Sequence, residues 1–217
     1  MVRTEIFTGA FLIILTAVLT VGELSLKEDR NAMRDYERFS YAVEKAVDDA
    51  CEYLGIVPEN ENGLTKENAE YVESIFIEAM AAALGRNVNL CRGQLVDMTA
   101  AFAVFDGKGR MISRPTGRGG EWKLFENIKN EDEAAEAIME IIKEGCLHED
   151  GFGGNINRAA AEAEKRLFLP DETGLTGYRA SSGRSILVCM VCNRRSGLTG
   201  EKGFVCIRNA CLRKKKT

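Results

Sequence analysis

An uncharged, strongly apolar run begins at the sixth residue and constrains what the rest of the chain can do. The run Ile6–Gly22 reads IFTGAFLIILTAVLTVG, which is 17 residues without a charge or a proline. As a helix it would span roughly 25 Å, close to the ~30 Å hydrocarbon core of a bilayer. Leu24 and Leu26 can extend it. We therefore predict a transmembrane anchor over residues 1–26, facing lipid through Ile6, Phe7, Phe11, Leu12, Ile13, Ile14, Leu15, Val18, Leu19 and Val21.

Two other interpretations of this run stay open, as does its orientation. A cleaved signal peptide would need a basic segment before the run and a small-x-small exit. Here Arg3 is offset by Glu5, and Thr20-Val21-Gly22 is a poor exit. A buried core helix is the third interpretation. By the positive-inside rule, the basic residues after the run favour a cytoplasmic body; they are Lys27, Arg30, Arg34 and Arg38.

The segment after the anchor has the periodicity of an amphipathic helix. Its apolar positions fall on one helical face, at Met33, Tyr36, Val43, Val47, Ala50 and Leu54. Neither Gly nor Pro interrupts residues 23–54, so anchor and stalk are predicted to form one helix that ends at Gly55. We assign residues 27–56 to this stalk and expect it to pack through Val43, Val47, Ala50 and Leu54.

Residues 57–183 are predicted to form an α+β head. Thr65 is a good N-cap for a second helix. Alternating residues at Met98–Phe105 and a turn at Asp106–Gly109 predict a β-hairpin with Arg110–Ser113. Two more helices are expected, one after a capping box at Asn130-x-x-Glu133 and one over Asn157–Phe168. The fold class is therefore α+β: a transmembrane helix continuing into a long amphipathic helix, then a small antiparallel sheet packed by about three helices.

The last 34 residues, 184–217, are predicted to form a separate basic hairpin from Ser185–Val191 and Phe204–Arg208. This segment has nine Lys/Arg and one Glu, a net of +8, whereas the whole chain has a net charge of −4. A solvated terminus, or a clamp on acidic helices of the same or another subunit, would explain the basic character. The pattern does not favour nucleic acid as a partner, because aromatic residues are not interleaved with the basic ones.

Four of the seven cysteines are spaced in a way that admits a metal site. The pattern is Cys189-x2-Cys192-x13-Cys206-x4-Cys211, and four thiolates on two turns can hold Zn²⁺. The first pair lies in a strand-like run, where residues three apart face opposite sides, so zinc binding would need a turn at Met190-Val191. A disulfide and ordinary buried thiols remain the alternatives. No other cofactor is predicted.

The residues give no support for an enzyme or for a small-molecule substrate. His148 is the single histidine, so neither a triad nor a two-histidine metal site can be built around a second one. The glycine-rich stretches 117–120 and 151–154 are not followed by Lys-Ser/Thr. They therefore lack the signature of a phosphate-binding loop.

The order of four stretches resembles a family of membrane-anchored proteins that accompany pilus-like (Tad or type II secretion-like) gene clusters in Gram-positive bacteria. These stretches are the anchor followed by 41–50, then 65–68 with 76–85, the strand end Val104–Gly107, and Arg166–Pro170. The resemblance implies a minor-pilin-like surface component. A type IV pilin has a short basic leader and a Glu at the fifth mature position, whereas here Glu5 is fifth from the initiator Met, so we expect this chain to depart from the pilin pattern.

Two functions are therefore expected from the sequence. The first is a membrane-anchored structural or interaction protein, a minor-pilin-like component of a surface or secretion assembly. Its partners would be the lipid bilayer and either its own copies or pilus-like assembly proteins, and its body would be extracellular. The alternative is a membrane-tethered, cytoplasmic-facing zinc module whose basic tail binds nucleic acid or an acidic protein.

Overall fold

The computed structural model describes residues 2–57, 64–115, 120–128, 131–147, 183–196 and 200–212. Side chains are described for these residues apart from 2–14, 144–147, 191–196, 200–205 and a few single positions. The elements in chain order are α1 (Val2–Leu54), α2 (Lys66–Ala83), α3 (Val88–Met98), β1 (Thr99–Phe105), β2 (Met111–Pro115), β3 (Lys123–Phe125), α4 (Glu131–Leu147), β4 (Ser185–Ser196) and β5 (Gly200–Cys211).

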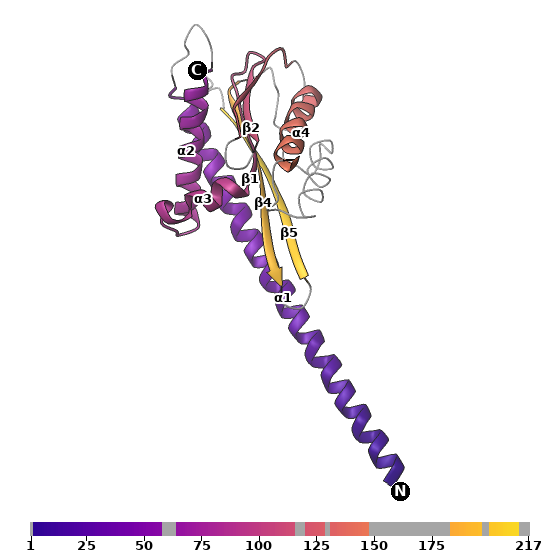
Figure 1. Ribbon diagram of the computed structural model, residues 1–217. Coiled ribbons are helices and arrows are strands. Elements are labelled where there is room, and N and C mark those ends of the chain that lie inside the picture. The colour runs from indigo at the N-terminus through magenta and orange to yellow at the C-terminus, as the bar shows by residue number, and fades with distance from the viewer. Residues whose placement is uncertain are drawn as a thin grey trace.

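Helix α1 is one continuous helix of 53 residues, about 80 Å long, as the sequence predicts (Figure 1). It ends at Gly55, whose N–H donates to the carbonyls of Cys51 (3.2 Å) and Glu52 (3.1 Å). The Arg184 guanidinium donates to the carbonyls of Leu54 (2.9 Å) and Val57 (2.5 Å). A cation at this position satisfies carbonyls that the helix leaves open and opposes the negative end of its dipole.

The five strands form one antiparallel sheet in the order β3-β2-β1-β4-β5. The predicted β1–β2 hairpin is present, and the Asp106 carboxylate accepts from the backbone N–H groups of Lys108 (2.6 Å) and Arg110 (3.1 Å). Gly107 and Gly109 have φ of 75° and 91°, which other residues rarely adopt. Because β4 pairs with β1, the hairpin predicted within residues 184–217 belongs to the sheet of the head.

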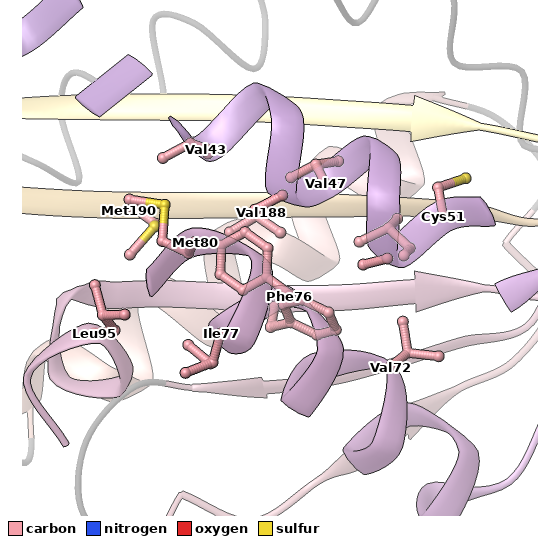
Figure 2. Packing of buried hydrophobic residues seen from close by; sticks show 14 of the residues in the cluster. Val43, Val47, Cys51, Val72, Phe76, Ile77, Met80, Leu95, Val188 and Met190 are labelled. Atoms are coloured by element: carbon pink, nitrogen blue, oxygen red, sulfur yellow. The ribbon is translucent and has the colours of Figure 1, made fainter. Parts of the chain in front are cut away.

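The two faces of the sheet are covered by different helices, which gives three layers (Figure 1). One face carries Phe102, Val104, Val188 and Met190, which pack with α1, α2 and α3. Figure 2 shows this cluster, in which Val47 of α1, Phe76 and Met80 of α2, and Val188 and Met190 of β4 lie together. The opposite face packs on α4 through a second cluster: Ala101, Ala103, Phe105, Met111, Leu187, Cys189 and Ile207 with Ala134, Ala137, Ile138, Met139 and Ile141.

The sequence predicted some of the helices of the head but not all of them. Thr65 caps α2 and forms a capping box with Asn68, and α4 begins where predicted. Helix α3 was not predicted, because it buries only Cys91 and Leu95 and so has almost no apolar periodicity. The expected helix over 157–168 lies outside the described residues.

Phe76→Ala should destabilise the head strongly. Phe76 is fully buried and its ring lies 5.6 Å from that of Phe102, so truncation removes apolar contacts and leaves a cavity. We expect a loss of about 3–5 kcal/mol in the free energy of unfolding. Urea unfolding followed by the fluorescence of Trp122, the single tryptophan, measures it. The control Leu90→Ala alters a side chain that is 87% exposed and should change stability by less than about 0.5 kcal/mol; equal losses would contradict the assignment of the core.

Candidate functional site

The N-terminal part of α1 leaves the head as an unaccompanied helix, and this projection is the most distinctive surface of the molecule (Figure 1). Among the described side chains of α1, Phe39 is the first that the head buries. Just before it, the Arg38 guanidinium donates to the carbonyl of Leu84 at the end of α2 (2.9 Å). Most described side chains from residue 15 to residue 38 are exposed.

Large apolar side chains remain exposed on this projection. Leu15 is 42% exposed, Val18 62%, Leu19 60% and Val21 54%, and Leu24 and Leu26 follow. At about 100° per residue, these positions spread over more than half of the helix circumference. Such a spread differs from an amphipathic surface helix, which shows one apolar stripe. It is typical of a helix that a surrounding apolar medium covers.

The predicted anchor is only partly within the described side chains. Leu15, Val18, Leu19 and Val21 are described, whereas Ile6, Phe7, Phe11, Leu12, Ile13 and Ile14 lie outside the described side chains. Within the part of the chain that the structure describes, none of the helices combines the length and the apolar character needed to traverse a bilayer.

The four residues predicted to pack the stalk are buried inside their own head. Val43, Val47, Ala50 and Leu54 are at most 1% exposed, and they contact α2 and the sheet. The stalk predicted over 27–56 is therefore divided in the structure. Its second half is the core helix of the head, and this stripe is not available to a second molecule.

Of the four cysteines in the predicted zinc site, the three with described side chains do not converge. Cys189 is buried on the α4 face of the sheet and Cys206 on the α1 face, so one ion cannot bind both. Cys211 packs on the α4 face, four positions along β5 from the partner of Cys189, and the side chain of Cys192 is not described. Among the described residues, no group of three or more His, Cys, Asp or Glu is placed to hold a metal ion.

The described cysteines are buried or half-buried, and none of these five is in a disulfide. The Cys51 thiol donates to the carbonyl of Ala210 (3.3 Å). Burial, with the nearby Cys211 thiol, raises the pKa of Cys51 to about 12, and burial also raises the pKa of Cys211. Thiols with raised pKa values are poor nucleophiles at neutral pH. Cys51 and Cys211 therefore have the character of packing residues.

One basic residue of the C-terminal hairpin clamps α1. The Arg208 guanidinium donates to the Ser40 hydroxyl and lies 3.9 Å from the Glu44 carboxylate. Cys206 lies beside Ser40 as well, with 3.8 Å between Sγ and Oγ. Arg208 therefore does what the intramolecular explanation predicts: it contacts an acidic residue of a helix in the same chain. Residues 213–217 lie outside the described residues.

A buried ion pair between α2 and β2 was missed by the sequence analysis. The Arg114 guanidinium contacts the Glu73 carboxylate through both Nε and Nη2 at 2.7 Å, and it lies 5.6 Å from the ring centroid of Trp122. Burial raises the pKa of Glu73, although Arg114 opposes this shift. Glu73 lies one turn from both Ala69 and Phe76, so a charge within this apolar stripe was the available signal for a buried partner.

Comparison of the chain with protein-family models, curated proteins and solved structures finds no match in any of the three.

Glu73→Ala should lower the free energy of unfolding far more than Glu70→Ala, one turn earlier in α2. Removing Glu73 leaves the largely buried Arg114 without its carboxylate, and we expect a loss of about 3 kcal/mol. Glu70 pairs with Lys66 at 3.8 Å, with both side chains more than half exposed. Glu70→Ala should therefore change stability by less than about 0.5 kcal/mol. Chemical denaturation of both variants tests this, and similar values would show that the Glu73–Arg114 pair has no special role.

Proposed function

We propose that this chain is a membrane-anchored structural or interaction protein, in which the N-terminal end of α1 lies in the bilayer and the C-terminal half holds an α+β head. The observation that carries the proposal is the set of exposed apolar side chains around α1 from Leu15 to Val21. They continue the uncharged run that begins at Ile6. Exposing these side chains to water is unfavourable, and lipid would cover them on every side.

The head supports an interaction role more than a catalytic one. The largely buried Glu73–Arg114 pair links α2 to β2. Arg208 and Arg184 are used to hold α1 against β5 and β4. These contacts fasten α1 firmly to the head, so that the projecting part extends from it as a continuous helix. A minor-pilin-like component of a surface or secretion assembly would need such a rigid connection between its anchor and its head.

Introducing Asp at both Ala10 and Ile13 should release the full-length protein from membranes. An aspartate near the middle of a spanning helix costs about 3 kcal/mol, so the two together disfavour insertion by about 6 kcal/mol, or roughly 10⁴-fold. Fractionation with an alkaline carbonate wash measures the bound fraction. The control Met33→Asp changes a residue of α1 that is 65% exposed but lies beyond the apolar run, and it should stay bound. Retention of the double variant would refute the anchor.

We further propose that the head lies outside the cell, as the resemblance to pilus-associated proteins implies and against the count of basic residues after the anchor. A cysteine introduced at Asn89, an exposed position of α3, tests this in a background without native cysteines. We expect a membrane-impermeant maleimide to label it in intact cells as completely as it labels a known surface protein. Labelling that appears only after lysis would place the head in the cytoplasm.

A further inference from the structure

The β4–β5 hairpin continues well beyond the rest of the sheet. Strand β1 pairs with β4 only as far as Met190, whereas β4 and β5 remain paired from Val191↔Val205 to Ser196↔Gly200. At ~3.4 Å per residue, these six additional pairs make a two-stranded extension of about 20 Å.

This extension runs along α1 toward the N-terminus of the helix. Three contacts fix the direction: Ala210 with Cys51 at 3.3 Å, Arg208 with Glu44 at 3.9 Å, and Cys206 with Ser40 at 3.8 Å. From one contact to the next, the residue number decreases on both β5 and α1, so the strand and the helix run in the same direction. Figure 1 shows the two strands beside α1 along the lower part of the head.

The end of the hairpin therefore lies close to the end of the apolar run. From Cys206 to Gly200 the strand covers about 20 Å, which α1 covers in about 13 residues. Counted from Ser40, this distance brings the hairpin end to the level of Lys27–Arg30. The apolar run ends at Gly22, with Leu24 and Leu26 beyond it. A headgroup layer, about 6 Å thick on each side of the hydrocarbon, would begin at this level.

The residues that the hairpin brings to this level are mainly basic. Arg194 pairs in register with Lys202, and Arg195 with Glu201, so three of these four positions are basic and one is acidic. A lysine or arginine near an anionic membrane surface shifts the equilibrium toward the bound state about fivefold. Charge and depth therefore both match an anionic lipid headgroup.

We propose that the end of the β4–β5 hairpin is a second membrane attachment, which binds the headgroups of anionic phospholipids in the bilayer that holds α1. The inference rests on the proposed anchor. It assigns a partner to Arg194, Arg195 and Lys202, the basic residues of the hairpin end. The contact of Arg208 with α1 does not explain these residues. With α1 inserted and the hairpin bound, the head is held at two places and cannot swing freely about the anchor.

The competing explanation is an intramolecular one, in which the basic hairpin end is neutralised by acidic residues of α1 such as Glu23, Asp29 and Asp35. That arrangement would be indifferent to the charge of the lipid. The two explanations therefore separate on lipid composition.

The test places a single tryptophan at the hairpin end of the full chain, by combining Trp122→Phe with Ser196→Trp. The protein is reconstituted into phosphatidylcholine vesicles with or without phosphatidylglycerol, and nitroxide-labelled headgroups quench the tryptophan. We expect stronger quenching with phosphatidylglycerol and a decline as salt is added, because salt screens exposed charges. Arg194→Glu, Arg195→Glu and Lys202→Glu together should lower the ratio of bound to unbound hairpin by at least about a hundredfold.

The matched control reverses three exposed basic residues away from the hairpin end, Lys66, Arg86 and Lys108, and should keep the quenching of the parent. Lys202→Gln alone should lower the bound ratio about fivefold, and circular dichroism checks that each variant is folded. Vesicle flotation separates the two proposals. Protein that floats but is quenched equally with both lipids overturns the headgroup site and leaves the anchor standing. Protein that does not float with either vesicle overturns both.

Discussion

The head depends on the burial of one face of α1, from Phe39 to Leu54. Ala42, Ala46 and Ala50 on this face have no exposed surface, and their small side chains let α2 and the sheet approach α1 closely. Val43 and Val47 are buried on the same face, in one cluster with Val188 and Met190 of β4 (Figure 2). Both helix α2 and strands β4 and β5 pack against this face, so losing it would separate the helical layer from the sheet.

The strong local signals in the sequence predicted much of this architecture. The length of α1, the stop at Gly55, the cap at Thr65 and the β1–β2 turn each depend on a few neighbouring residues, and each is present. Helix α3 was not predicted because one capping residue, Asn87, and two buried side chains give almost no apolar periodicity. The pairing of the C-terminal hairpin with β1 was not predicted for another reason. It is a pairing between residues 80 or more positions apart, and no local preference encodes it.

The candidate sites also divide into those that local sequence predicts and those that depend on long-range packing. The exposed apolar residues of α1 follow directly from composition, so the sequence indicated them. The face of a strand on which each cysteine lies depends on register, which a shift of one residue reverses. The spacing of Cys189 and Cys206 therefore admitted a shared ion that the sheet separates. Glu73 and Arg114 lie 41 residues apart, and only the packing of α2 on β2 brings them together.

The union of the first helix with the last two strands has a consequence for the order of synthesis. Cys51 and Ala210 touch across 159 residues of chain, and at 5–20 residues per second the ribosome needs roughly ten to thirty seconds to make them. During that interval the apolar face of α1 has α2 to cover it but not β4 or β5. The head therefore closes only after β4 and β5 have been synthesised. A nascent chain interrupted before β4 keeps an unfinished core, which quality-control proteases recognise as unfolded.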